Sequence, residues 1–398
     1  MSDILTGATK VSDINQQQLR LAMEEMTAML DPNQHLLNKV LEKIGPVKSY
    51  GRRKVEWRER RLLPCSTTVT VAASAADTTV SVATPKIGAR DQVVYAPRTN
   101  SIFVMNEDVG GTAAAGKITV RGVSGSGGIP TALQVGDVLN FLLEAHAEGE
   151  DIPPAYANTE DAFYTYIQQF DATIKVTDIT RFEDGYGTPD ELGKQRKQKY
   201  IELIRAFCLA CYGSQAYLET VSGTANARRY TMASLPAYLR ANARDLSALP
   251  PGSLSLAVFA DIVRTTKFHS ASSAKKIAIA GQNAIVSISA LPANAVRTTP
   301  GAQSQWGTTV QSILTAFGEV DIMHDQLLSQ EYGQADRMYI LDPNAEYLHL
   351  AQLNNLPWQI LTNRQNPTDV HNVIDIHTGT RGFILKLPEL HKEVIGIN

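Results

Sequence analysis

The apolar residues near the start of the chain form two stripes at helical spacing. Neighbours within each stripe lie mostly three or four residues apart, which places the stripe on one face of a helix. Asp31-Pro32-Asn33 separates the stripes and Gly45-Pro46 ends the second. Two short helices with a hinge cannot bury both stripes on each other, so we expect them to dock on the body of the chain or on a neighbouring subunit. The stripes are Leu19, Met23, Met26 and Leu30, then Leu36, Leu37, Val40, Leu41 and Ile44.

From Leu62 to Leu143 the pattern changes to short alternating segments of β-branched residues. Such alternation, interrupted by glycine-rich turns, is typical of half-buried strands. The predicted strands cover 67–71, 78–82, 93–95, 102–104 and 118–120, and a last apolar segment follows Val138. We therefore predict a small all-β module over about 64–145, inserted between two extended segments.

The two segments that flank this module are charged and extended. Seven basic residues between 48 and 61 surround Val55 and Trp57, whereas the module ends at an acidic stretch, 148–151, followed by aromatic residues over 156–170. A two-stranded ribbon with one basic and one acidic strand favours pairing between subunits. An ordinary surface and a nucleic-acid surface, where bases stack on rings between cations, are the alternatives. Glu56 and Glu59 in the basic segment weigh against nucleic acid.

The clearest helix pattern in the chain runs from Pro189 to Tyr212. Thr188-Pro189-Asp190-Glu191 is a capping box with proline at the first helical position, and Gly213 ends the helix. At about 1.5 Å per residue the helix is about 36 Å long. Beyond it, helical stretches at 232–246 and 254–268 alternate with strands at 276–279, 320–323 and 338–341, which predicts an α/β layer to about residue 365. Strands at 373–376 and 383–386 follow.

Composition narrows the class of protein. The 398 residues suffice for two or three domains, and 43% hydrophobic residues suffice for a core. With 37 basic and 40 acidic residues the net charge is −3, which weighs against bulk nucleic-acid binding. No apolar run approaches the ~18–20 residues of a membrane span. Three cysteines give no disulfide framework, and the first residues lack a secretory signal, so we expect a soluble protein made in the cytoplasm.

The motifs that could indicate nucleotide binding, zinc binding or redox chemistry are incomplete. Gly111–Lys117 fits most of a phosphate-binding loop, but Ile118 stands where Ser or Thr should reach Mg²⁺, and a strand follows instead of a helix. Cys208 and Cys211 lie inside the long predicted helix, where a buried apolar stripe explains them better than zinc or redox chemistry.

The histidines show no metal or catalytic pattern. His371 and His377, with Asp369 and Asp375 nearby, could be drawn as a metal cluster, but a solvated loop beside a strand explains them better. Neither H-E-x-x-H nor G-x-S-x-G occurs. We therefore expect no enzyme activity, no cofactor and no metal.

The order of these parts is specific, and several short motifs accompany it. The sequence resembles the major capsid proteins of tailed bacteriophages with the Hong Kong-type, HK97-like, capsid fold. The resemblance covers nearly the whole chain and rests on the order of the motifs. The matching residues are Asp31-Pro32, Glu56-Trp57, Gly111-Thr112, Gly136-Asp137, Glu148-Gly149, Gln168-Gln169-Phe170, Phe317-Gly318 and Ile340-Leu341-Asp342-Pro343.

This resemblance implies an α+β fold in five parts. They are an N-terminal helical arm (1–45), an extended loop with linking strands and the inserted β module (46–187), a peripheral domain with a long spine helix (188–235), an axial α/β domain (236–365), and C-terminal strands that complete the peripheral domain (366–398).

The resemblance also implies a function. The chain would self-assemble through hexamers and pentamers into an icosahedral head that encloses double-stranded DNA without reading its sequence, with portal, scaffold or decoration proteins as further partners and no membrane. It would assemble in the host cytoplasm and reside in the virion. A bacterial compartment shell protein and a nucleotide-binding enzyme using Gly111–Lys117 are the alternatives.

The interface residues predicted for this shell combine ribbon charges with aromatic anchors. Charged groups of one subunit would pair with a neighbour, and large rings would supply apolar contact. The candidates are Arg52, Arg53, Lys54, Trp57, Arg58, Glu150, Asp151, Tyr164 and Phe170.

Overall fold

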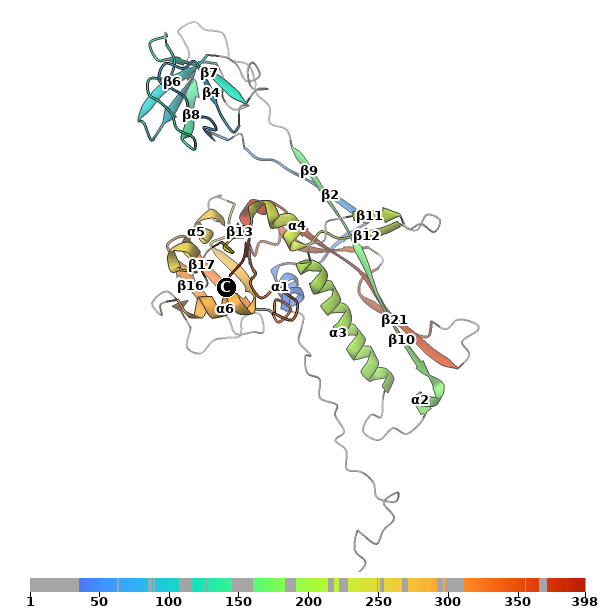
Figure 1. The fold of residues 1–398 in the computed structure, drawn as a ribbon. Helices are drawn as coiled ribbons and strands as arrows, with labels where there is room; N and C mark the ends of the chain where they lie inside the picture. Colours follow the sequence, from blue (N-terminus) through green and yellow to red (C-terminus); the bar gives the residue numbers. More distant parts are fainter. Residues whose placement is uncertain are drawn as a thin grey trace, which may run out of the picture. The chain divides into compact units, whose positions relative to one another are not determined.

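A computed structural model describes most of the chain after residue 35 (Figure 1). The described residues are 36–62, 64–84, 88, 90–106, 116–125, 127–144, 160–182, 191–213, 218–221, 228–248, 250, 254–266, 271–291, 296–297, 311–354, 356–364 and 371–397. The first predicted helix, residues 111–115 of the candidate phosphate loop, the capping box at 188–190, Glu150, Asp151 and Asp369 lie outside them.

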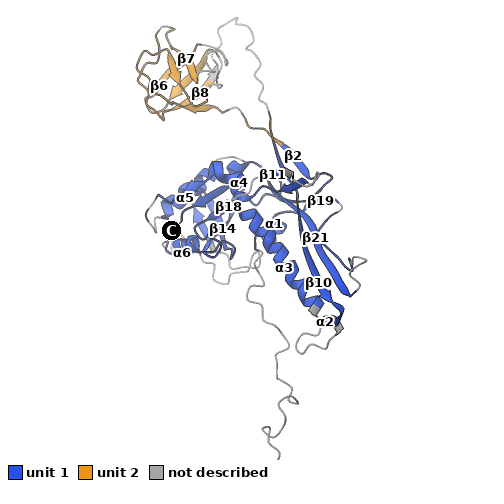
Figure 2. Cartoon of the chain, turned by 45° about the vertical axis from the view of Figure 1, so that its right-hand side comes forward, with its two compact units in different colours: residues 1–57, 163–398 blue, residues 58–162 orange. Residues whose placement is uncertain are grey.

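The chain divides into two units, coloured separately in Figure 2. Unit 1 comprises residues 1–57 and 163–398, and unit 2 comprises residues 58–162. In the sequence, unit 2 is thus an insertion in unit 1. A two-stranded sheet, β2 (Lys54–Glu59) with β9 (Asp161–Tyr166), carries the chain out of unit 1 and back. We call this sheet the ribbon.

Unit 2 is an antiparallel barrel of six short strands. They are β3 (Ser66–Thr68), β4 (Thr79–Ser81), β5 (Gln92–Ala96), β6 (Ser101–Met105), β7 (Lys117–Gly122) and β8 (Val138–Glu144). The hydrogen-bonded order is β3-β8-β5-β6-β7-β4. A bridge between Val69 and Val82 joins the two end strands and closes the ring. Closure removes the unpaired edges that would otherwise promote aggregation.

The barrel has a core of its own. Val80, Phe103 and Leu139 are fully buried in it, because alternate residues of each strand point inward. Arg98 donates to the carboxylate of Asp137, with Nη2 at 2.7 Å from Oδ2. The same carboxylate oxygen accepts from the Gln134 amide at 2.7 Å, which fixes the turn before β8.

Unit 1 contains a five-stranded sheet covered by the long helix. The sheet consists of β1 (Lys48–Tyr50), β19 (Leu348–Leu353), β21 (Asn372–Leu385) and β10 (Gln168–Thr177), with β20 (Gln359–Leu361) also paired to β21. Helix α3 (Glu191–Tyr212) runs along β10 and β21 in both views (Figures 1 and 2). Its start near Glu191 and its end before Gly213 confirm the predicted helix. Helix α2 (Asp178–Phe182) follows β10.

A seven-stranded sheet forms the other layer of unit 1. Its order is β13-β22-β18-β14-β17-β16-β15, and β14 (Lys275–Ala280), β17 (Gly318–His324) and β18 (Met338–Leu341) lie at its centre. Helices α5 (Leu256–Thr266) and α6 (Gln282–Ser289) contribute to the core on one face. On the other, Ile277 and Ile279 pack in the cluster that also takes residues of α1 (Leu36–Ile44), α3 and α4 (Leu235–Leu239). The remaining strands are β13 (Arg244–Asp245), β15 (Val296–Arg297), β16 (Gln311–Thr315) and β22 (Lys392–Ile395).

The strands on either side of residue 365 do not separate into the two sheets as the predicted domain boundary there requires. β22 pairs with β18 and β13 in the seven-stranded sheet, so the C-terminal strands do not all complete the sheet that α3 covers. Conversely, β19 and β20 lie before residue 365 but pair with β21. The two predicted strands at 373–376 and 383–386 are one strand, β21, because Thr378–Arg381 between them also pair with β10.

Of the predicted helices, 36–44 is confirmed as α1, the one at 189–212 is confirmed over its described residues 191–212, and the one at 254–268 is confirmed as α5, which begins at Leu256. The predicted helix at 232–246 is wrong over its second half. Helix α4 ends at Leu239, a 3-10 turn covers Arg240–Asn242, and β13 follows. Pairing of Arg244 and Asp245 with β22 overrides the local helical preference there.

Candidate functional site

The ribbon and the turn just before β2 contain six of the nine predicted interface residues. Arg52 and Arg53 are exposed in the turn before β2, and Lys54 and Arg58 are exposed on β2 itself. Val55, between them, is 7% exposed and packs with Ile167 and other residues of unit 1. The ribbon therefore presents a row of cations while its apolar side chains hold its base.

Part of the expected charge pairing occurs within the chain. Arg58 lies 3.6 Å from Glu160, and Arg61 lies 3.4 Å from Asp161 and 2.9 Å from Glu59. The side chain of Arg58 stays 76% exposed in this pair. Exposed pairs such as Arg58 with Glu160 and Arg61 with Asp161 contribute about 0–1 kcal/mol each, so a neighbouring subunit could replace them at little cost. Glu59 is different, because only 3% of its side chain is exposed in the pair with Arg61.

At the base of the ribbon, cations lie over tyrosine rings. Lys54 Nζ is 4.3 Å from the ring centroid of Tyr164, and Arg53 Cζ is 5.5 Å from that of Tyr230. Lys54 also forms an ion pair with Glu56. The hydrogen bond to Glu56 is the main cause that raises the pKa of the Lys54 ammonium. The Lys54 ammonium is therefore charged at neutral pH.

The three predicted aromatic anchors have different environments. Trp57 is half-buried and stacks on Phe163 at 6.3 Å between ring centroids. Tyr164 is half-buried and meets Tyr166 edge to face at 5.9 Å. Both keep some exposed surface for a partner.

Phe170 is different, because it is 8% exposed and belongs to the core of unit 1. Its ring stacks on Trp358 at 6.2 Å and meets Phe207 edge to face at 5.8 Å. Packing within its own chain therefore accounts for this side chain, and its ring has little surface left for a neighbour. The structure corrects the expectation that Phe170 lies ready at an interface.

A hairpin that the sequence analysis missed adjoins the ribbon. Strands β11 (Leu218–Val221) and β12 (Arg228–Thr231) form it, and Glu219 on β11 is its central polar residue. Arg228 Nη1 donates to Glu219 Oε1 at 2.6 Å, and the hydroxyl of Tyr166 donates to Oε2 at 3.4 Å. The spacing of residues in the sequence does not predict the contact between Tyr166 and Glu219, because it joins segments about 50 residues apart.

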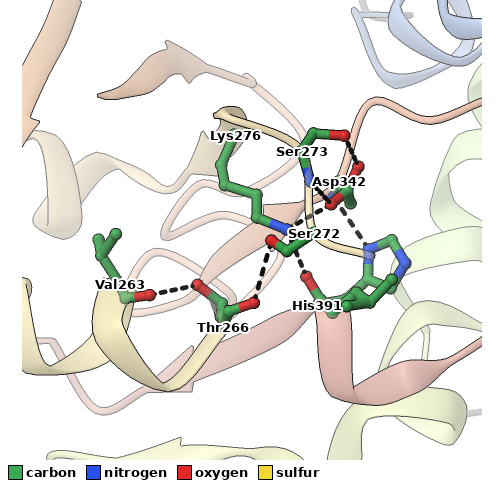
Figure 3. A network of polar contacts seen from close by, with 8 residues as sticks. Val263, Thr266, Ser272, Ser273, Lys276, Asp342 and His391 are labelled. Carbon is green, nitrogen blue, oxygen red and sulfur yellow. Dashed lines mark hydrogen bonds and ion pairs between the residues drawn. The ribbon is translucent and has the colours of Figure 1, made fainter. Parts of the chain in front are cut away.

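A buried polar network lies in the seven-stranded sheet (Figure 3). Lys276 and Asp342 are both fully buried, and Nζ lies 2.5 Å from Oδ2. Lys276 also donates to the carbonyl of Leu390 at 3.1 Å, and the Ser273 amide donates to Asp342 at 2.9 Å. His391 Nδ1 accepts from the Asp342 amide at 3.0 Å. Burial lowers the pKa of His391 to about 3, so this imidazole is neutral, as an accepting nitrogen requires.

This network holds the C-terminal segment against β14 and β18. All of its charged atoms are out of reach of a dissolved substrate, and each has a partner. Its chemistry is therefore that of a structural ion pair. Sequence spacing gave no sign of it, since Lys276 and Asp342 are 66 positions apart.

The residues considered for other chemistry have structural partners. Lys117 opens strand β7, so a strand follows the candidate phosphate loop, as predicted. Cys208 and Cys211 are fully buried on α3, and burial raises the pKa of Cys208 to about 12. Asp375 accepts from Arg196 at 2.6 Å, and His377 Nε2 lies 3.0 Å from the Arg196 carbonyl oxygen.

Among the described residues, no three His, Cys, Asp or Glu side chains come close enough to hold a metal ion. Within the same part of the chain, no helix has the length and apolar character needed to cross a membrane.

A solved capsid structure shares this architecture. The capsid of Myoviridae Phage XM1 superposes with a TM-score of 0.50 at 10% identity, covering 96% of this chain and 98% of that one. A chain from the structure of Mycobacterium phage Ogopogo gives a TM-score of 0.48 at 10% identity over 98% of this chain and 99% of that one. The capsid of a native GTA particle gives 0.47 at 9% identity over 97% of each chain. The fold is thus that of tailed-phage capsid proteins, HK97-like, as the sequence predicted.

The family model is more specific. Residues 9–369 match the model of the SU10 major capsid protein, and the chain belongs to that family. No curated protein matches the sequence. The chain is therefore a major capsid protein of the tailed-phage type, and the alternatives of a compartment shell protein and a nucleotide-binding enzyme find no support.

Proposed function

We propose that copies of this chain build the icosahedral head of a tailed phage by forming hexamers and pentamers around double-stranded DNA. The observation that carries this proposal is the family match over residues 9–369 on a chain with the capsid fold. The work of the protein is then the formation of interfaces, and its family indicates a structural rather than a catalytic role.

The ribbon is the surface that we assign to contacts between subunits. Arg52, Arg53, Lys54 and Arg58 present exposed cations there, and Trp57 and Tyr164 keep partly exposed rings beside them. Acidic groups of a neighbour, with Glu150 and Asp151 as candidates, would complement these cations. Large obligate interfaces exceed about 2,000 Å², and a projecting two-stranded element adds such area without enlarging the core.

Further partners follow from the same role. A head that fills with DNA needs a portal, and scaffold or decoration proteins can assist assembly. The chain would assemble in the host cytoplasm and remain in the virion. The net charge of −3 suits an inner face that does not hold DNA tightly.

Assembly of a charge-reversed variant tests the ribbon assignment. Arg52→Glu/Arg53→Glu should leave the subunit folded but prevent shells, because both charges would then repel acidic groups of a neighbour. Lys117→Glu/Lys197→Glu makes the same change of net charge at exposed positions outside the ribbon and is the matched control. Light scattering and electron microscopy of the same samples measure assembly. Normal shells from the ribbon variant would overturn the assignment, whereas a wild-type chain that forms no shells with its partner proteins present would contradict the function itself.

A further inference from the structure

The hairpin β11–β12 and the residues that follow it attach to the base of the ribbon. Thr165, fully buried on β9, accepts at Oγ1 from the Ala233 amide at 3.3 Å. Gln168 Oε1 accepts from the Met232 amide at 3.3 Å. The ribbon base is therefore held by side-chain contacts to a segment that is distant in the sequence.

Glu219 is the charged centre of this attachment. Its Oε1 accepts from Arg228 at 2.6 Å and from the Tyr230 hydroxyl at 3.4 Å, while its Oε2 accepts from the Tyr166 hydroxyl at 3.4 Å. The rings of Tyr166 and Tyr230 lie 5.1 Å apart, directly beside these bonds. One carboxylate thus binds both strands of the hairpin to β9.

A two-stranded ribbon depends on such an attachment for its direction. Two isolated strands are at best marginally stable in water, and they have no third strand to resist bending. The direction of the ribbon is therefore decided where it meets unit 1. On the other side of the base, Trp57 lies 6.5 Å from Tyr238, whose hydroxyl donates to the Phe383 carbonyl at 3.2 Å.

We propose that Glu219 is a positioning residue that fixes the direction in which the ribbon leaves unit 1, and through it the curvature of the shell. This inference rests on the proposed function, in which the ribbon contacts neighbouring subunits. A rotation at the base changes the direction of both strands of the ribbon. Loss of Glu219 should therefore alter how subunits meet more than how each subunit folds.

The exposure of the Glu219–Arg228 ion pair separates an effect on contacts between subunits from an effect on folding. The side chain of Glu219 is 29% exposed and that of Arg228 is 62% exposed. Ion pairs this accessible contribute little to folding stability. Their removal should leave the unfolding midpoint of unit 1 unchanged, which distinguishes a positioning role from a merely structural one.

The test compares Glu219→Ala with a charge swap, Glu219→Arg/Arg228→Glu. The control is Glu202→Ala, which removes the exposed pair of Lys199 and Glu202 on α3, also at 2.6 Å. Hydrogen exchange of residues 161–166 is measured on the unassembled subunit, and particle diameters are measured by electron cryomicroscopy. We expect Glu219→Ala to exchange about fivefold faster in this segment and to give a broader range of diameters. The charge swap should restore both, and the control should change neither.

Two results would overturn the proposal. One is exchange and diameters in Glu219→Ala equal to those of the wild type, and the other is a charge swap that restores neither. Because the exchange measurement uses the unassembled subunit, it tests the attachment separately from the proposed shell function. Failure of the wild-type chain to form shells would count against that function and leave the exchange result to decide on Glu219.

Discussion

Replacement of Lys276 by methionine is the sharpest test of how the seven-stranded sheet is held together. The ammonium of Lys276 lies 2.5 Å from Asp342 Oδ2, and both side chains have 0% exposure. Methionine fills much of the same volume without the charge. The variant would leave a buried carboxylate with the donors of Ser273 only, and it would leave the Leu390 carbonyl without the lysine donor.

The expected loss of stability is large. Removing one partner of a buried ion pair costs about 3–5 kcal/mol, because the remaining charge is neither solvated nor paired. The lost donor to Leu390 adds to this, since an unsatisfied buried carbonyl costs about 1–3 kcal/mol. The two costs overlap, because one ammonium supplies both contacts, so we expect about 3–5 kcal/mol in total.

The loss should depend on pH in a defined direction. In the wild type, burial raises the pKa of Asp342, but hydrogen bonds from Lys276 and Ser273 outweigh it and hold the pKa below its ordinary value of 3.8. This carboxylate therefore stabilises the fold above the unfolded pKa, and the contribution is lost as pH falls through the folded pKa. In Lys276→Met burial dominates and raises the pKa, so stability is lost as pH rises. The difference between the proteins should thus widen from about pH 4 to pH 7.

Tryptophan fluorescence during urea unfolding measures this loss in the correct unit. All three tryptophans, Trp57, Trp306 and Trp358, lie outside residues 58–162, so their signal follows unit 1. Lys199→Met is the matched control, because Lys199 pairs with Glu202 on an exposed helix face. It should cost no more than about 0.5 kcal/mol. A loss in Lys276→Met as small as in the control, or one that does not change with pH, would refute the argument.

Three other substitutions test the two cores. Phe170→Ala should destabilise unit 1 by about 3–5 kcal/mol in the same fluorescence assay, and a loss below about 1 kcal/mol would show that the ring is not a core residue. Asp137→Asn should reduce the acid sensitivity of the barrel. The hydrogen bond from Arg98 lowers the pKa of Asp137, so the stability that this carboxylate contributes is lost as pH falls below about 4, and hydrogen exchange in β5–β8 can follow that loss. Gly128→Ala should destabilise the barrel by about 1–3 kcal/mol, because the new Cβ would lie 1.9 Å from the Asp77 carbonyl oxygen; unchanged exchange in β4 and β7 would contradict this.

Local patterns in the sequence were sufficient for much of the fold. The stripe from Leu36 to Ile44 and the residues of 191–212 became α1 and α3, because an apolar stripe at helical spacing has one favourable way to bury itself. The alternating β-branched segments became the strands of the barrel for the equivalent reason in strands. The order of these parts also indicated the capsid family before any contact was known.

The sequence could not determine the contacts between distant segments. The pairing of β22 with β18, the continuity of β21 through Gly379, and the burial of Phe170 against Trp358 all depend on which surfaces meet. Local propensity is a weak preference of less than about 1 kcal/mol per residue, and tertiary packing overrides it.

The residues of the candidate site also divide into those that the sequence indicates and those whose roles only the folded structure reveals. The cations in and around the ribbon are visible in the sequence, because seven basic residues fall within the fourteen residues 48–61. Glu219 and the pair of Lys276 and Asp342 are single residues in unremarkable surroundings. Their roles arise only when folding brings Tyr166 to Glu219, or excludes water from the lysine and the aspartate. Periodicity therefore predicted most of the elements, and the resemblance in the order of the motifs indicated the class of protein. The tertiary structure decided which charges are buried and which side chains hold the ribbon, because desolvation and contact are properties of the folded chain.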